Sequence, residues 1–401
     1  MARRLCCRTR QGILILHIHP SDLRGVSRLA ITATTRITDL VETMHATVTS
    51  LPQLRPTITE RRTRGITGFV YGNVRGVTQL VGGVIDLALW PLEALAEAPA
   101  TTDEREALLA VVNGVLGDHL AATHNPLAIR PALRRHDTAP ATGKVAVLVH
   151  GLCMNDRQWR RKGHDHGAAL ARDLGYTPLY AHYNSGEHIS TNGRILADLL
   201  ETTLADWPQP LDELVIIGHS MGGLVARSAC HYAAEAGQRW LQSLRKLVFL
   251  GTPHHGSPWE RSGNWIDIGL GLVSYTAPLA RVGKLRSAGI TDLRHGSLLD
   301  EDWNAHDRFE HNHDVRRPLP LPDGVCCYAV AAALDESEAG YVSNLIGDGL
   351  VPLQSAHGDH AREEFHLGVP AAQRWTGYNM HHLDLLDRPE VYARLRAWLE
   401  M

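Results

Sequence analysis

The residues with the clearest chemical potential lie at 218–222 and read Gly-His-Ser-Met-Gly. The apolar, β-branched run 214–217 before them predicts a buried strand, and the small residues after them predict a helix. Glycine at 218 and 222 permits the close approach of strand and helix that a sharp turn requires. Such a turn presents its serine at the strand end, beside the free N–H groups of the new helix. The segment therefore predicts that Ser220 is a nucleophile.

A serine hydroxyl becomes a good nucleophile only when a base takes its proton and an acid orients that base. In strand–turn–helix arrangements of this kind, the acid follows the serine along the chain and the histidine comes last. We expect the acid to be Asp348, which lies in a Gly-Asp-Gly turn after the predicted strand 325–331. Asp335 is the alternative, because it follows that strand more closely.

The base is expected on a late loop before the final helix, where two histidines are adjacent. They cannot both point into one site. We choose His382, because it directly precedes a Leu-Asp-Leu-Leu segment that returns to the core, and His381 is the alternative. Asp384 is expected to cap the turn that follows.

Two backbone N–H groups are needed to bind the oxyanion that forms when the serine attacks. One is expected from Met221, directly after the serine, and the other from Leu152, in the loop after the predicted strand 145–149. We expect the substrate site to be lined by neighbours of these turns. They are His150, Gly151, His219 and His254. For His254, in the segment Gly-Thr-Pro-His, a structural role in holding its loop by hydrogen bonding is favoured over lining the acyl pocket.

Strands and helices alternate through residues 144–401. This alternation predicts an α/β fold with a mostly parallel sheet and helices on both faces. Residues 257–322 do not continue the alternation of strands and helices, and they are longer than an ordinary connection between two strands. We interpret them as an inserted cap, with a peripheral insertion as the alternative. Residues 131–143 are rich in proline, arginine, alanine and threonine and are expected to be a linker.

Residues 22–130 form an N-terminal helical region with three sets of apolar residues at helical spacing. The middle set carries Gly68, Gly72 and Gly76, a spacing that favours close helix packing, so we expect a buried helix. Peripheral contact with a membrane surface is the alternative. Residues 1–21 are expected to be a disordered or non-native extension, with a secretory signal as the alternative.

Composition excludes several classes of protein. The formal net charge of −3 gives no field suited to nucleic acid. The spacing of the cysteines does not match that of a disulfide-bonded framework, which favours reduced thiols and a cytoplasmic protein. No cofactor is expected. A metal site is not expected either, because the surroundings of three clustered histidines indicate a solvated surface. These are His306, His311 and His313.

These motifs together resemble the α/β-hydrolase superfamily, and within it bacterial triacylglycerol lipases and the esterases related to GPI inositol-deacylase. The resemblance covers roughly residues 144–400, and its most selective parts are Gly-Thr-Pro-His at 251–254 and Gly-Asp-Gly-Leu-Val-Pro at 347–352. It implies the α/β-hydrolase fold and hydrolysis of carboxylic esters. The helical first third has no counterpart in the resemblance.

The hypothesis from sequence is a serine carboxylic-ester hydrolase that acts on acyl-chain or lipid esters through an acyl-enzyme. An acyltransferase with the same triad is one alternative, since the sequence does not show whether water reaches the acyl-enzyme. A non-catalytic scaffold whose helical third binds a membrane or a partner is the other. The sequence leaves the oligomeric state undetermined.

Overall fold

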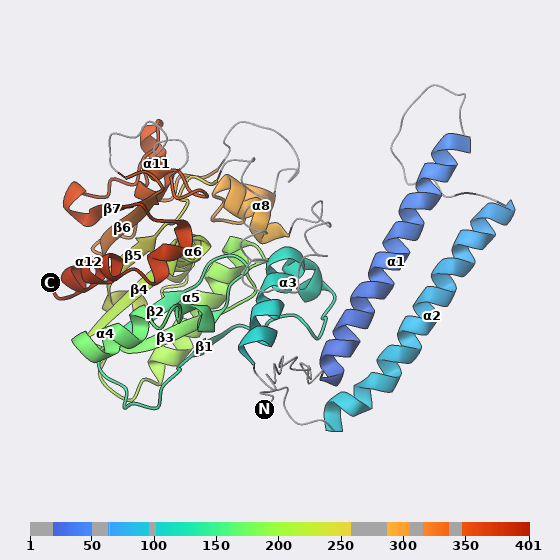
Figure 1. Cartoon of the computed structure of the whole chain (residues 1–401), viewed down its shortest axis with the longest axis horizontal. Helices are drawn as coiled ribbons and strands as arrows, with labels where there is room; N and C mark the ends of the chain where they lie inside the picture. Colours follow the sequence, from blue (N-terminus) through green and yellow to red (C-terminus); the bar gives the residue numbers. More distant parts are fainter. Residues whose placement is uncertain are drawn as a thin grey trace, which may run out of the picture. The chain divides into compact units, whose positions relative to one another are not determined.

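The computed structural model describes residues 19–49, 63, 65–95, 102–257, 287–304, 316–336 and 347–401. The chain divides into two compact units. One comprises Met1–Thr101 with Asn125–Leu127, and the other Thr102–His124 with Ala128–Met401 (Figure 1). The sequence pattern predicted an N-terminal helical region that ends near residue 130. The third helix of that region, Asp103–Ala122, belongs to the second unit.

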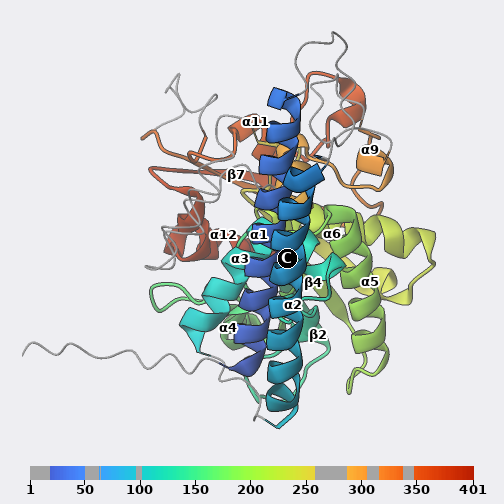
Figure 2. The same cartoon turned by 90° about the vertical axis from the view of Figure 1, so that its right-hand side faces the viewer.

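The first unit is a hairpin of two long helices, α1 (Pro20–Thr49) and α2 (Gly65–Leu95). Figures 1 and 2 show them side by side along their length. Gly82 marks a close approach, because a Cβ there would lie 2.8 Å from Ile31 Cγ1. The prediction that this helix is buried is wrong, because most apolar side chains of α2 are exposed. At Gly72 and Gly76 an added Cβ would meet no atom within 4 Å outside the helix's own backbone, so these glycines mark no close packing.

The second unit is built on one sheet with the strand order β1-β3-β2-β4-β5-β6-β7. All neighbouring strands pair in parallel except β1 and β3, so the expected mostly parallel sheet is confirmed. The strands are β1 (Ala132–Arg134), β2 (Lys144–Val149), β3 (Thr177–His182), β4 (Glu213–His219), β5 (Leu244–Leu250), β6 (Cys326–Ala333) and β7 (Arg374–Tyr378). The predicted linker 131–143 thus contains an edge strand, a three-residue element too short for a periodic signal.

Helices cover both faces of the sheet, as expected for strands whose side chains are apolar on both sides. In β2, Val145 and Val147 pack on one face while Ala146 and Leu148 pack on the other. The first face is covered by α3 (Asp103–Ala122), α5 (Ile189–Ala205), α6 (Met221–Glu235) and α8 (Ala288–His295). The second is covered by α4 (His166–Leu174) and α12 (Pro389–Leu399).

Short helices complete the described part of this unit. They are the helices α9 (Glu301–Asn304) and α11 (Leu353–His357) and the 3₁₀ helices η1 (Asp156–Trp159), η2 (Arg239–Ser243), η5 (Glu363–Phe365), η6 (Ala371–Gln373) and η7 (His382–Leu386). Much of the predicted cap 257–322 lies outside the described residues, as do residues 1–18 and the histidines at 306, 311 and 313. Across the described ranges, no helix is long and apolar enough to cross a membrane.

Candidate active site

Ser220 occupies the turn between β4 and α6, where the sequence predicted it. Its backbone has φ 56° and ψ −125°, a strained conformation for a residue with a side chain, which typically costs about 1–3 kcal/mol. The Ser220 N–H donates to the Leu250 carbonyl at 2.8 Å and ties the turn to the end of β5. The Ser220 hydroxyl is buried and has no hydrogen-bond partner among the described residues.

The glycines around the serine are required by close backbone approach. A Cβ at Gly222 would lie 2.1 Å from the Val149 carbonyl oxygen, and one at Gly218 would lie 2.5 Å from Gly223 Cα. Real Cβ atoms do not approach other atoms this closely. Glycine therefore lets α6 start directly against β2 and β4 and holds Ser220 at the carboxyl edge of the sheet.

The structure pairs His382 with Asp348, which are the base and acid chosen from sequence. The His382 Nδ1 atom lies 2.6 Å from an Asp348 carboxylate oxygen, and both side chains are buried. The other carboxylate oxygen accepts the N–H groups of Leu350 and Val351, each at 2.9 Å. A carboxylate fixed in this way accepts a hydrogen bond from Nδ1–H, which leaves the lone pair of the neutral ring on Nε2.

The loops around Ser220 also surround His382. A Cβ at Gly251, the first residue after β5, would lie 3.1 Å from His382 Nδ1. The ring of His219 lies 4.7 Å from that of His382, and His219 Nε2 donates to the His382 carbonyl at 3.3 Å. Burial holds the pKa of His219 well below its usual value, so this ring is neutral. Ser220 and His382 therefore lie at the same sheet edge, joined through His219 and Gly251.

The two alternative residues are placed differently. His381 is exposed at the start of η7, where its N–H donates to the Asp384 carboxylate at 3.0 Å. Asp384 thus caps this turn, as the sequence indicated. Asp335 is half-buried after β6, and its backbone carbonyl accepts the Asn379 N–H. The carboxylate at His382 is that of Asp348.

The loop after β2 lies against the serine. A Cβ at Gly151 would lie 3.0 Å from Ser220 Cβ and 3.4 Å from Ser220 Oγ. The preceding His150 is buried with its ring 4.2 Å from that of Tyr183, whose hydroxyl donates to the His150 carbonyl at 2.6 Å. Burial lowers the pKa of His150 to about 3. Leu152, the next residue of this loop, is buried as well.

Three residues of this region were not predicted from the sequence. Tyr183 fixes the His150 carbonyl, Ser185 accepts the Cys153 N–H at 3.0 Å, and Arg227 contacts His254. For Arg227 a signal was present, because it is a lone charge on the otherwise uncharged run 221–230. The Arg227 contact places His254 against α6, which favours its structural role.

Residues 140–316 match the family described as PGAP1-like alpha/beta domain. Among solved structures, the mature lipase BlEst2 of Bacillus licheniformis is 17% identical, with a TM-score of 0.41, over 68% of this chain and 96% of its own. An esterase from Thermogutta terrifontis is 16% identical, with a TM-score of 0.37, over 68% of this chain and 93% of its own. No curated protein matches the chain. The sheet order and the serine turn, together with the family match, give this unit the α/β-hydrolase fold.

Proposed function

We propose that this protein is a serine carboxylic-ester hydrolase in which Ser220, His382 and Asp348 form a catalytic triad. The observation that carries the proposal is the buried 2.6 Å pair of His382 and Asp348 at the same sheet edge as the strained turn of Ser220. In a serine triad such a carboxylate orients the histidine toward the nucleophile. Other buried histidines of this unit also meet a carboxylate, as His182 meets Asp156 at 2.7 Å, so it is the position of His382 beside His219 and Gly251 that links its pair to Ser220.

The reaction proceeds in two halves. In the first, Ser220 Oγ attacks the ester carbonyl while His382 Nε2 takes the hydroxyl proton, and Asp348 stabilises the imidazolium through Nδ1–H. The N–H groups of Leu152 and Met221 bind the oxyanion, each contributing roughly 3 kcal/mol to transition-state stability. His382 then gives its proton to the leaving alcohol. In the second half, water attacks the acyl-enzyme by the same route and releases the acid and free Ser220.

Covalent labelling with a fluorophosphonate tests the nucleophile directly. We expect the folded protein to gain one phosphonyl group, located on Ser220 by peptide mass spectrometry, because the proposed base and oxyanion donors would activate this hydroxyl. Heat-unfolded protein, which has lost the arrangement, serves as the control and should stay unlabelled. A folded sample that reacts no faster than the unfolded one would contradict the proposal.

We further propose that the α1–α2 hairpin rests on a lipid surface, which would bring the enzyme to acyl-chain esters. The two charged residues of α2 between Gly65 and Leu92 are both paired with α1. Asp86 accepts from Arg24 and Arg28, each at 2.7 Å, and Arg75 donates to Asp39 at 3.0 Å. The rest of α2 is left with exposed apolar side chains. These include Ile66, Phe69, Val77, Leu80, Val84, Leu87 and Trp90.

Sedimentation with lipid vesicles tests this second proposal. We expect Leu87→Asp to weaken vesicle binding at least about tenfold, because it replaces an apolar contact with a charge at the lipid boundary. Thr34→Asp is the matched control, since it adds the same charge at an exposed polar position of α1 and should bind as the wild type does. Equal binding by Leu87→Asp and wild type would refute the lipid contact.

A further inference from the structure

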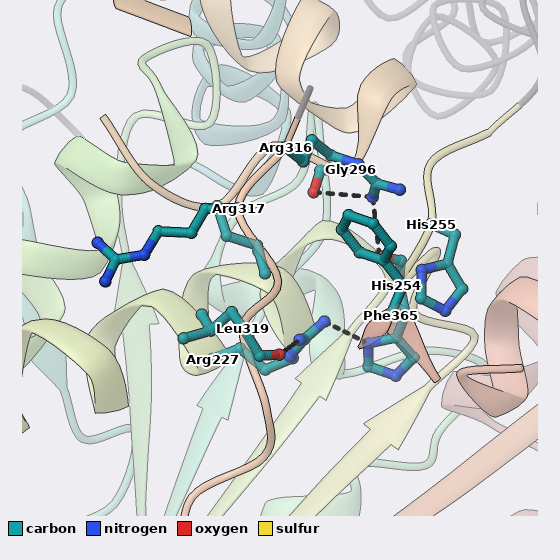
Figure 3. A pocket seen from close by; sticks show the side chains of 9 residues that line it. Arg227, His254, His255, Gly296, Arg316, Arg317, Leu319 and Phe365 are labelled. Carbon is teal, nitrogen blue, oxygen red and sulfur yellow. Dashed lines mark hydrogen bonds between the residues drawn. The ribbon is translucent and has the colours of Figure 1, made fainter. Parts of the chain in front are cut away.

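A cationic pocket lies in the sheet unit, formed by segments that are distant in sequence. Its walls come from α6, from the loop after β5, from the turn after α8 and from the segment that leads into β6. Figure 3 shows the side chains that face it. The groups that matter for its chemistry are Arg227, His254, His255, Gly296, Arg316 and Phe365.

Arg227 places a positive charge in the protein interior. The residue is 4% exposed. Its guanidinium donates to the Leu319 carbonyl and, at 3.3 Å, to His254 Nδ1. Its buried Nε–H has no hydrogen-bond partner among the described residues. Among those residues, Asp302 is a carboxylate that acts on the Arg227 charge through space, without a hydrogen bond. Burial lowers the pKa of Arg227 to about 10, so the group remains charged at neutral pH.

The histidines beside Arg227 offer no compensating negative charge. Because the guanidinium can only donate, His254 Nδ1 must be the acceptor, so the ring is neutral and its proton is on Nε2. That Nε2 atom is buried and has no partner among the described residues. Burial lowers the pKa of His255 to about 4, which leaves this ring neutral as well.

Arg316 brings a second guanidinium to the same pocket. Its Nη1 donates to the Gly296 carbonyl at 3.3 Å and lies 3.5 Å from the His254 carbonyl oxygen. The guanidinium lies over the Phe365 ring at 5.2 Å. In Figure 3 Arg316 faces the pocket, whereas the neighbouring Arg317 directs its guanidinium away from it. The pocket therefore presents two cations and N–H donors.

We propose that this pocket binds a small oxyanion of the phosphate type between Arg227 and Arg316. A buried charge is unfavourable unless an opposite charge pairs with it directly, and an anion that accepts from the Arg227 guanidinium supplies that pairing. Guanidinium donors match the geometry of phosphate oxygens. The lone Arg227 Nε–H is a donor that such an anion would satisfy.

The pocket is connected to the candidate active site through one short loop. Gly251 packs on His382, a Cβ on Gly223 would meet Thr252 Oγ1 at 2.0 Å, and His254 accepts from Arg227. An anion held by Arg227 would therefore contact the loop at His254, two positions after Thr252 and three after Gly251, the residue that packs on His382. The anion can be a phosphate group of the ester substrate, or free phosphate that binds as an effector. Both possibilities rest on the proposed function, because each assumes that the protein hydrolyses esters.

Calorimetric titration with inorganic phosphate, against chloride at equal ionic strength, tests the site without any assay of catalysis. We expect the wild type to bind phosphate saturably and Arg316→Gln to bind it about tenfold more weakly, since one charge-assisted pair is lost. Arg317→Gln is the matched control with the same charge change and should retain wild-type affinity. Arg316→Lys, which keeps the charge but loses the planar fork, should fall between them and provides a second variant.

Absence of phosphate-specific heat in the wild type would overturn the proposal, and so would equal affinities for Arg316→Gln and Arg317→Gln. Where binding is found, two esters that share an acyl group distinguish the sources, one with a phosphate-bearing alcohol and one with a neutral alcohol. A KM that Arg316→Gln raises only for the phosphate-bearing ester identifies a substrate group. If free phosphate changes the rate of hydrolysis of the neutral ester, and Arg316→Gln abolishes that change, phosphate is an effector. Failure of hydrolysis with intact phosphate binding would count against the proposed function alone.

Discussion

Ser220→Ala is expected to lower kcat for hydrolysis of a p-nitrophenyl ester by about 10⁴- to 10⁶-fold. The substitution removes the hydroxyl that the strained turn presents beside the loop of Gly151, which is the proposed nucleophile. Without it the acyl-enzyme cannot form, and only binding and oxyanion donors remain to assist direct attack by water. Alanine has no polar atom to leave unsatisfied, so we expect the fold to be retained.

Ser228→Ala is the matched control for this experiment. Ser228 lies on the same helix, is equally buried, and donates its hydroxyl to the Leu298 carbonyl at 2.8 Å. Loss of one such hydrogen bond is expected to destabilise the protein by about 1 kcal/mol without changing kcat by more than about threefold. Retention of the wild-type rate by Ser220→Ala would exclude the proposed nucleophile.

Local sequence was sufficient to predict the elements that carry the site. The serine turn depends on a β-branched strand, two glycines and a small-residue helix, all contained in residues 214–223. The geometry at Gly218 and Gly222 shows why the local pattern is so restrictive, since any side chain there would overlap backbone atoms. The chain order of serine, acid and histidine then left only two choices at each remaining position.

Contacts between distant segments were not predictable in the same way. Nothing near Arg227 in sequence indicates that Leu319 and His254 will accept its hydrogen bonds. The third helix looked like its two predecessors, but residues such as Val111 and Val115 pack on the sheet core. Apolar periodicity identifies the buried face of a helix without identifying its partner, which is why the boundary between the units was misplaced.

Asp348→Asn is expected to lower kcat by about 10⁴-fold, and the structure gives a specific reason. The N–H groups of Leu350 and Val351 hold one side-chain oxygen in place, so the asparagine amide oxygen keeps that position. Its NH₂ group then replaces the oxygen that lies 2.6 Å from His382 Nδ1. Because the amide nitrogen can only donate, Nδ1 must accept, and the ring proton moves to Nε2. A ring in this tautomer cannot take the serine proton.

This prediction separates an orienting carboxylate from a merely structural one. We expect the KM of Asp348→Asn to stay near the wild-type value while kcat falls, and nitrogen NMR of the His382 ring should show the proton on Nε2. His381→Ala is the matched control, because His381 is exposed one residue away, and its kcat should change by no more than about threefold. The double variant Ser220→Ala/Asp348→Asn should be no slower than Ser220→Ala alone, since both changes remove the same proton-coupled attack. Additive losses in the double variant would show that Asp348 acts on something other than the nucleophile's base.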